Sequence, residues 1–310
     1  MNTGFIGLGR MGSGMAGNLV KAGVPLSVFD TNPEALRLMA DAGAHACTSV
    51  RNVVQESTVV FLSLPGPAQV EQVILGPNGI LETIRPGTTV IDLSTSSVSL
   101  ARRLQIQLEA KGASLLDAPV SGGPVGAMSG YLAIWVGGSK DVFDEYVELL
   151  SIIGHHPRHV GPIGTGTITK LAHNMVGYMI MLSLAEVLSV AVKAGSDPLE
   201  LWEAMRLGAV GNRSPLDLLV NQFLPGTYEP AAFALELAHK DVVLATGLGK
   251  EVGVPMRLAN LTLEEMTEAL SQGWGQQDSR SFLKLQLQRA GVEIAVDPQL
   301  MREALGRNGQ

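Results

Sequence analysis

The stretch Gly4-Phe-Ile-Gly-Leu-Gly-Arg-Met-Gly12, close to the N-terminus, decides the fold. Its apolar start leads directly into the spacing Gly7-x-Gly9-x-x-Gly12. A helix-favouring segment follows, and then a second apolar run that ends at Asp30. A strand, a glycine turn, a helix and an acid in this order predict a βαβ unit that binds a dinucleotide.

Each glycine of this turn has a separate expected task. Gly7 permits the tight turn, Gly9 lets the backbone approach a pyrophosphate, and Gly12 lets the helix pack closely on the sheet. The free N–H groups at the start of the helix are expected to hold the anion. The residues predicted to bind the cofactor in this unit are Gly7, Leu8, Gly9, Arg10, Met11, Gly12 and Asp30.

Asp30 bears on the choice between NAD and NADP. It lies 23 positions after Gly7, close to the offset at which an acid accepts hydrogen bonds from the adenosine ribose. Its charge would repel the 2′-phosphate of NADP, and the residues that follow, Thr31, Asn32 and Pro33, include no arginine or lysine. The sequence therefore favours NAD over NADP. The alternative task for Asp30 is to cap the next helix, which Thr31 or Asn32 would serve as well.

Short β-branched runs alternate with helical periodicity over the first half of the chain, a pattern typical of a parallel sheet built from βαβ units. We expect an α/β Rossmann-type domain at 1–162, an all-α domain at 163–292 and a tail at 293–310 that is a short helix or disordered. The expected strands are Gly4–Ile6, Leu26–Phe29, Val59–Leu62, Thr89–Asp92, Ser114–Asp117 and Leu132–Val136. The expected helices of the first domain are Met11–Ala22, Glu34–Ala42, Ala68–Ile74, Leu100–Lys111 and Asp141–Ile152.

The composition excludes several classes of protein. With 310 residues, 46% of them hydrophobic, the chain can bury a large core. Its net charge of -7 gives no general attraction to nucleic acid or to anionic lipid. The apolar segment 175–194 is about as long as a membrane span, but Glu186 would be costly in a bilayer, so a buried helix is the better interpretation. We expect neither nucleic acid nor a membrane as a partner.

Metal binding is not expected from the residue types. Cys47 is the single cysteine, so no intrachain disulfide and no thiolate zinc site is expected, which suits a reducing compartment and a cytoplasmic protein. His155, His156 and His159 are close in sequence, but Pro157 breaks helical spacing and no neighbouring cysteine or carboxylate completes a set.

Four segments together resemble one family, the β-hydroxyacid dehydrogenases, which includes 3-hydroxyisobutyrate dehydrogenase and tartronate semialdehyde reductase. The first is the glycine-rich stretch Gly4–Gly23, and the second is Asp117-Ala-Pro-Val-Ser-Gly-Gly123. The third is Gly161-Pro-Ile-Gly-Thr-Gly-Thr-Ile-Thr-Lys-Leu-Ala-His-Asn174, and the fourth is Phe233-Ala-Leu-Glu-Leu-Ala-His-Lys-Asp241. The resemblance extends from Gly4 to about Gly291.

This resemblance implies a catalytic apparatus. Lys170 would be the general acid/base, and Asn174, one helical turn later, would bind the substrate and orient the lysine. Ser121, Gly122 and Gly123 would bind the substrate carboxylate; an ordinary tight turn is the alternative there. His173, a possible alternative base, lies about 60° from Lys170 and about 100° from Asn174 around the helix, so a supporting or structural role is expected for it. Further contacts to the cofactor are expected from Leu64, Pro65, Thr95 and Lys240.

The implied reaction is hydride transfer between NAD and the alcohol or aldehyde of a small 3-hydroxy carboxylic acid, in a homodimer or homotetramer. 3-Hydroxyisobutyrate, L-serine, glycerate, threonate and 4-hydroxybutyrate all fit, and the sequence does not separate them. Arg213 is either a selectivity element for an extra anionic group or a surface residue. Two alternatives stay open, an NADPH-dependent imine or semialdehyde reductase and a non-catalytic NAD-binding protein.

Overall fold

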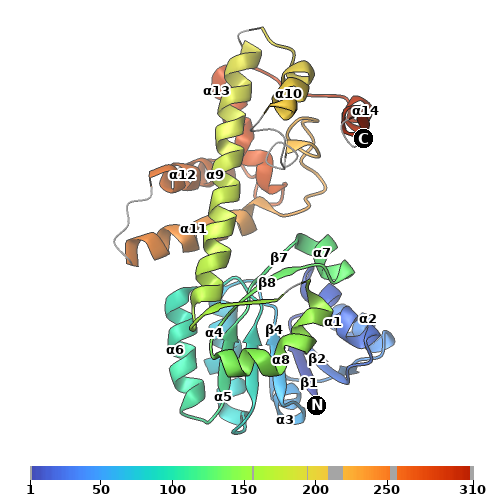
Figure 1. The fold of residues 1–310 in the computed structure, drawn as a ribbon, viewed down its shortest axis with the longest axis vertical. Helices are drawn as coiled ribbons and strands as arrows, with labels where there is room; N and C mark the ends of the chain where they lie inside the picture. The colour runs from blue at the N-terminus through green and yellow to red at the C-terminus, as the bar shows by residue number, and fades with distance from the viewer. Residues whose placement is uncertain (1, 156, 194, 209–218, 252–256, 308–310) are drawn as a thin grey trace. The chain divides into compact units, whose positions relative to one another are not determined.

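The structure is a computed structural model that describes residues 2–155, 157–193, 195–208, 219–251 and 257–307 (Figure 1). The chain divides into two compact units, Met1–Leu171 and Ala172–Gln310. This division lies nine residues after the predicted boundary between residues 162 and 163. Each unit is described by itself.

A largely parallel sheet forms the centre of the first unit (Figure 1). Its strands lie in the order β3-β2-β1-β4-β5-β6-β8-β7, and β9 pairs with β8. The pairs from β3 to β6 are parallel, as predicted, whereas β8 runs antiparallel to both β6 and β7. The strands are β1 (Thr3–Ile6), β2 (Leu26–Phe29), β3 (His45–Ala46), β4 (Val59–Leu62), β5 (Thr89–Asp92), β6 (Ser114–Asp117), β7 (Val120–Ser121), β8 (Ala133–Gly137) and β9 (Arg158–Gly161).

Helices cover both faces of this sheet, which explains why the central strands are apolar throughout. Alternate residues of β1 show the two faces: Phe5 packs with α1, α2 and α8, while Ile6 packs with α3, α4, α5 and α6. The helices are α1 (Gly12–Lys21), α2 (Pro33–Asp41), α3 (Val50–Glu56), α4 (Pro67–Leu75), α5 (Ile80–Thr83), α6 (Val98–Glu109), α7 (Gly123–Ser129) and α8 (Lys140–Ile153). The predicted Rossmann-type α/β domain is confirmed.

A buried carboxylate fixes the start of the long helix α9 (Thr165–Lys193). Asp117, at the end of β6, accepts hydrogen bonds from the backbone N–H groups of Gly164 and Thr167, each at 2.7 Å. These are N–H groups of the first turn, which a helix cannot satisfy internally. The sheet therefore sets the position of the first turns of α9, which carry Lys170.

Every element that the structure describes in the second unit is helical, as predicted for this domain. The elements after α9 are α10 (Pro198–Leu207), α11 (Leu235–Glu251), α12 (Arg257–Ser271), the 3-10 helix η2 (Ser279–Leu283), α13 (Lys284–Ala290) and α14 (Pro298–Arg307), which lies in the expected tail. In the described part of the chain, no helix is long and apolar enough to cross a membrane.

Candidate active site

The predicted cofactor residues of the first unit follow the carboxyl ends of parallel strands. Gly7 follows β1, Asp30 follows β2, Leu64 follows β4 and Thr95 follows β5. These strands are neighbours and parallel, so the four segments leave the sheet at one edge. β1 lies between β2 and β4, and the chain adds β2 and β3 on one side of β1 and β4, β5 and β6 on the other. Sheets of this kind bind ligands in the crevice at the point where the strand order changes direction.

The glycine turn has the local geometry that a dinucleotide requires. Gly7 has a φ of 97°, and a Cβ there would collide with the carbonyl oxygen of Ser63. A Cβ on Gly12 would collide with the carbonyl oxygen of Gly7, so the helix starts in direct contact with the turn. A Cβ on Gly9, in contrast, would meet nothing within 4 Å. Protein atoms thus fill the space beside Gly7 and Gly12, whereas the space beside Gly9 is empty, which fits a pyrophosphate approaching the backbone at Gly9.

Asp30 is tied to this turn by hydrogen bonds. Its carboxylate accepts the backbone N–H of Leu8 at 2.5 Å and that of Asn32 at 2.7 Å. The N-cap of α2 is Asn32, whose side chain accepts the N–H of Glu34 at 3.0 Å. Asp30 is therefore not the cap of α2, and its half-buried carboxylate lies beside the glycine turn.

The loops after β4 and β5 are joined to each other. The backbone N–H of Leu64 donates to Oγ of Ser94 at 2.9 Å, and the N–H of Ser94 donates to the carboxylate of Asp92 at 3.0 Å. Asp92 is buried, and this burial raises its pKa to about 7. The bonds hold the segment of Leu64 and Pro65 next to the segment of Thr95, at the sheet edge where the cofactor is expected.

The predicted carboxylate-binding turn joins β7 to α7. Ser121 ends β7, and Gly122 and Gly123 follow with φ values of 137° and 61°. Both values lie in the region that favours glycine, so the double glycine has a conformational reason. A Cβ on Gly123 would meet nothing within 4 Å, and the two glycines are exposed. The binding of a carboxylate here stays a prediction.

Lys170 and Asn174 both lie on α9, one helical turn apart, and both are half-buried. Nδ2 of Asn174 donates to Oδ2 of Asp241 at 2.7 Å. Asp241, on α11, is only 3% exposed, and its other oxygen lies 3.2 Å from Nζ of Lys240. One buried carboxylate thus holds two residues that the sequence analysis selected.

Asp241 itself was not predicted as a site residue and was named only as the last residue of the fourth quoted segment. The available signal was its position: it falls at helical spacing among the buried residues of α11, after Leu235 and Ala238. A charged residue on a buried helix face needs a partner. The same carboxylate adds to the effect of burial in raising the pKa of Tyr178 well above its usual range.

Among the described residues, the histidines that the sequence also offered as candidates make none of the contacts given above. His173 is exposed on α9, and Arg213 and His156 lie outside the described residues. The ring of His155 stacks on Tyr131 with 4.3 Å between ring centres, and Nε2 of His159 lies 2.9 Å from the carbonyl oxygen of Gly138. Local packing thus accounts for His155 and His159.

Two family models match the chain. Residues 2–168 match the NAD binding domain of 6-phosphogluconate dehydrogenase, and residues 164–286 match the NAD-binding domain of NADP-dependent 3-hydroxyisobutyrate dehydrogenase. Together they cover the Rossmann-type sheet, its glycine turn and most of the helical unit.

Known proteins resemble the chain over nearly its whole length. The 2-(hydroxymethyl)glutarate dehydrogenase of Eubacterium barkeri is 36% identical over 94% of this chain and 97% of its own. The NAD-dependent L-serine dehydrogenase of Pseudomonas aeruginosa is 35% identical over 91% and 96%. The solved 3-hydroxyisobutyrate dehydrogenase of Mycobacterium tuberculosis superposes with a TM-score of 0.81 at 28% identity, over 92% of this chain and 98% of its own. The chain therefore belongs to the β-hydroxyacid dehydrogenase family and is an oxidoreductase with a nicotinamide-binding domain.

Proposed function

We propose that the protein transfers hydride between NAD and the alcohol or aldehyde of a small 3-hydroxy carboxylic acid, with Lys170 as the general acid/base. The observation that carries this proposal is the pair Lys170 and Asn174 on α9, with the amide of Asn174 fixed by the buried Asp241. A lysine that exchanges a proton and an amide held in one orientation are the groups that alcohol oxidation needs.

The residues have separate tasks in this chemistry. The bound nicotinamide supplies the hydride acceptor, or the donor in the reverse direction. Lys170, in its neutral form, takes the hydroxyl proton during oxidation and returns a proton to the carbonyl oxygen during reduction. An amide nitrogen carries two N–H groups, so Asn174 can donate one to Asp241 and the second to a substrate oxygen. Ser121, Gly122 and Gly123 bind the substrate carboxylate.

Asp30 supports NAD as the cofactor over NADP. Its carboxylate lies beside the glycine turn, where it would accept hydrogen bonds from the ribose and repel a 2′-phosphate. One relative is named for NAD dependence, the L-serine dehydrogenase of P. aeruginosa. Leu64, Pro65, Thr95 and Lys240 complete the proposed cofactor contacts.

A substrate panel tests the activity. NADH formation would be followed with 3-hydroxyisobutyrate, L-serine, 2-(hydroxymethyl)glutarate, glycerate, threonate and 4-hydroxybutyrate, each offered with NAD and with NADP. We expect at least one acid to reduce NAD, with a higher kcat/KM for NAD than for NADP. Reduction of a cyclic imine by NADPH, with no hydroxyacid oxidised, would contradict the proposal and favour an imine reductase. NAD binding without any turnover would favour a non-catalytic protein.

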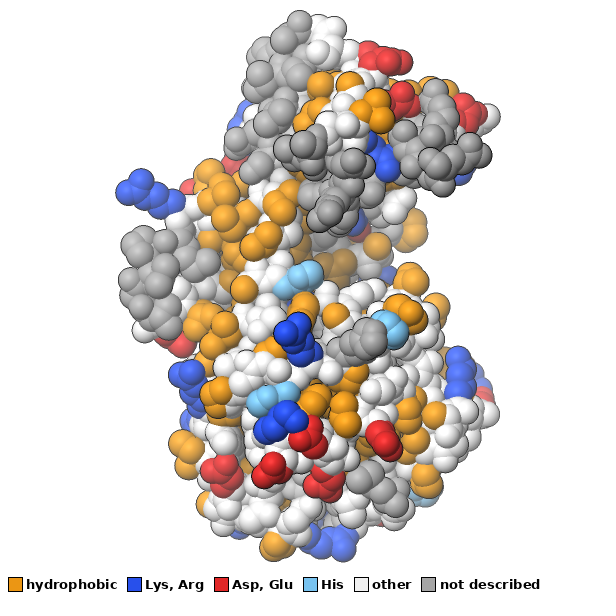
Figure 2. All heavy atoms as spheres, viewed as in Figure 1, with side chains coloured by type: hydrophobic (Ala, Val, Ile, Leu, Met, Phe, Trp, Pro, Cys, Tyr) orange, Lys and Arg blue, Asp and Glu red, His pale blue; other side chains and the backbone are white. Residues whose placement is uncertain are grey.

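We also propose that the protein works as a homodimer or homotetramer in the cytoplasm. The second unit exposes large apolar side chains on three helices, Val176 on α9, Val243 on α11 and Leu261 on α12, at 55, 44 and 41%. Hydrophobic side chains are also gathered over part of this unit on the face drawn in Figure 2. Such surface is typical of an interface between subunits. Light scattering coupled to gel filtration tests it, and a monomer at micromolar concentration would contradict it.

A further inference from the structure

A hollow of about 790 Å³ lies at the amino-terminal edge of the sheet. Its lining includes Asn2, Pro25, Thr58 and Thr88, each directly before a strand of the parallel set. The glycine turn leaves the sheet at the carboxyl ends of these strands, so the hollow is at the opposite edge from the cofactor segments. The reaction proposed above uses no residue of this hollow.

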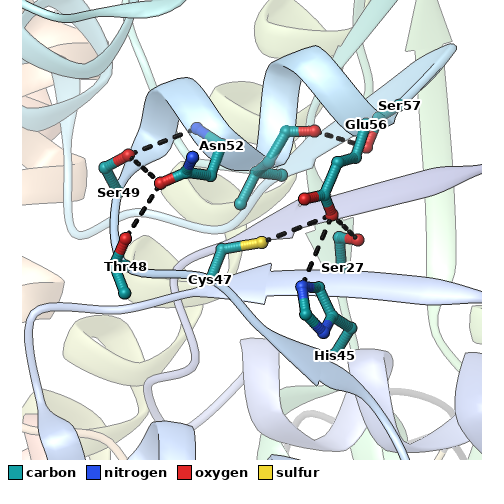
Figure 3. A network of polar contacts seen from close by, with 9 residues as sticks. Ser27, His45, Cys47, Thr48, Ser49, Asn52, Glu56 and Ser57 are labelled. Atoms are coloured by element: carbon teal, nitrogen blue, oxygen red, sulfur yellow. Dashed lines mark hydrogen bonds and ion pairs between the residues drawn. The ribbon is translucent and has the colours of Figure 1, made fainter.

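Three side chains of different chemistry converge beside it, as Figure 3 shows. Oε2 of Glu56 lies 3.7 Å from Nε2 of His45 and 3.7 Å from Sγ of Cys47. The three ligand atoms all lie within 4.8 Å of one another. The imidazole and the carboxylate line the hollow and are partly exposed, whereas Cys47 is only 5% exposed.

The fold places these three side chains together. His45 is the first residue of β3, and Cys47 comes directly after this two-residue strand. Residues two apart along an extended chain point to the same side, so His45 and Cys47 do so here. Glu56 is the last residue of α3, and Ser27 on β2 donates a hydrogen bond to Oε2 of Glu56 at 2.8 Å (Figure 3). A hydrogen bond that orients a carboxylate in this way is a common support for a metal ligand.

We propose that His45, Cys47 and Glu56 form a Zn²⁺ site, with Ser27 orienting the carboxylate. Nitrogen, sulfur and oxygen together are a donor set that zinc accepts in tetrahedral coordination. With ordinary zinc–ligand bond lengths, tetrahedral ligand atoms are about 3.4–3.6 Å apart. The two 3.7 Å separations from Oε2 of Glu56 need shifts of only a few tenths of an ångström. The imidazole nitrogen and the thiol sulfur lie within 4.8 Å of each other and must approach by at most about an ångström. The fourth position is left to a water or to a small ligand in the hollow.

A single cysteine in the sequence led us to expect no thiolate zinc site. One thiolate is enough when imidazole and carboxylate complete the set. Burial and the neighbouring carboxylate raise the pKa of the Cys47 thiol to about 11, so the thiol keeps its proton until a cation replaces it.

The expected effect of the ion is structural. β3 is a two-residue strand at the end of the sheet order and is therefore weakly anchored. An ion bound to β3 and to the end of α3, with its carboxylate ligand held by β2, would fasten these elements to one another. Zn²⁺ should then stabilise the folded protein without changing the rate of hydride transfer.

The test uses the full chain, free of any tag and stripped of metal with a chelator. Zn²⁺ affinity is measured by competition with a chromophoric chelator, and Co²⁺ serves as a spectroscopic probe. We expect one tight Zn²⁺ per chain, a thiolate-to-Co²⁺ charge-transfer band in the near ultraviolet, and a higher Tm with Zn²⁺. His45→Gln, Cys47→Ala and Glu56→Gln should each weaken binding at least tenfold, and Ser27→Ala about tenfold.

Two matched controls accompany these variants. His155→Gln and Glu109→Gln alter exposed residues of the same types in the same unit and should leave Zn²⁺ affinity unchanged. His45→Gln alters a side chain that is 67% exposed, so it should fold and bind NAD like the parent protein. The proposal would be overturned if the parent protein did not bind Zn²⁺ tightly. It would also be overturned if Cys47→Ala and His45→Gln both bound Zn²⁺ as tightly as the parent protein and the parent protein with Co²⁺ showed no charge-transfer band. Neither result would bear on the dehydrogenase activity.

Discussion

At the scale of single residues, Asp30 contributes to the backbone as well as to cofactor choice. Its carboxylate accepts the N–H groups of Leu8 and Asn32, so it holds the glycine turn in place while its charge faces the expected ribose site. A substitution must therefore remove the charge and keep an acceptor. Asparagine removes the charge and keeps one acceptor oxygen, which can serve one of the two N–H groups.

Asp30→Asn is predicted to narrow the preference for NAD. Loss of the negative charge removes the repulsion of a 2′-phosphate, and loss of one carboxylate oxygen weakens the bond to the ribose. We expect kcat/KM for NAD to fall about tenfold or more relative to that for NADP. Steady-state kinetics with both cofactors measures the ratio. Asp41→Asn, which removes an exposed acid of α2, is the control, and an unaltered ratio in Asp30→Asn would count against the assignment.

Asp92 gives a prediction about stability and pH. Its pKa is raised to about 7 by burial, whereas in the unfolded chain an aspartate titrates near 4. Between these values the folded protein binds the extra proton, so this group makes stability fall as the pH rises from about 4 to about 7. Three pKa units correspond to about 4 kcal/mol at most.

Asp92→Asn should therefore stabilise the protein at pH 8, by up to about 4 kcal/mol, and have little effect near pH 4. Asparagine keeps an oxygen for the N–H of Ser94. Urea unfolding at several pH values measures the difference. A difference that is the same at every pH would show that folding does not change the pKa of Asp92 and would contradict this prediction.

At the scale of elements, the contact between the glycine turn and α1 leaves no room for a side chain at Gly12. Gly12→Ala would place its Cβ against the carbonyl oxygen of Gly7, so the turn must shift. We expect NAD affinity to fall at least tenfold and the free energy of unfolding to fall by about 1–3 kcal/mol. Isothermal titration with NAD and denaturant unfolding measure the two effects.

Gly17→Ala is the matched control on the same helix. A Cβ on Gly17 would meet nothing within 4 Å, so this change should raise helix stability by up to about 1 kcal/mol. NAD affinity should stay unchanged. If both alanine variants bind NAD equally well, the close contact at Gly12 is not needed for binding.

In the second unit, Asp278 joins the segment before α11 to η2. Fully buried, it accepts the N–H of Ala232 at 3.1 Å and a bond from Nη1 of Arg280 at 2.8 Å. Asp278→Ala would leave the arginine without this partner, and we expect a loss of about 3–5 kcal/mol in denaturant unfolding. Asp297→Ala removes an exposed acid at the start of α14 and should cost about 1 kcal/mol. Equal losses in both variants would contradict this account.

At the scale of the whole molecule, a feature of the fold could be predicted when a short stretch of the sequence specifies it. The glycine turn fits within six residues and its geometry follows from glycine alone, so its place in the fold was predicted correctly. The central strands are apolar runs bounded by turns, and β2, β4, β5 and β6 were predicted to the residue. The antiparallel direction of β8 has no local signal and was missed.

The residues that the sequence did not single out, Asp241 and Glu56, depend on contacts that only the fold creates. Asp241 meets Asn174 across 67 positions of the chain, and no local pattern links the two. Glu56 meets His45 because the short elements β3 and α3 bring them together. Both of these elements were missed in the sequence because they have two and seven residues and show too little periodicity.

The most direct measurement of the central claim is the initial rate of NADH formation by Lys170→Ala, with the preferred hydroxyacid and saturating NAD. The account predicts that kcat falls by about a hundredfold to ten-thousandfold, the usual contribution of a general acid/base, while NAD binding is unchanged. Lys111→Ala, which alters an exposed lysine of the first unit, should retain the full rate. A Lys170→Ala enzyme that works within a few-fold of the parent rate would contradict the account.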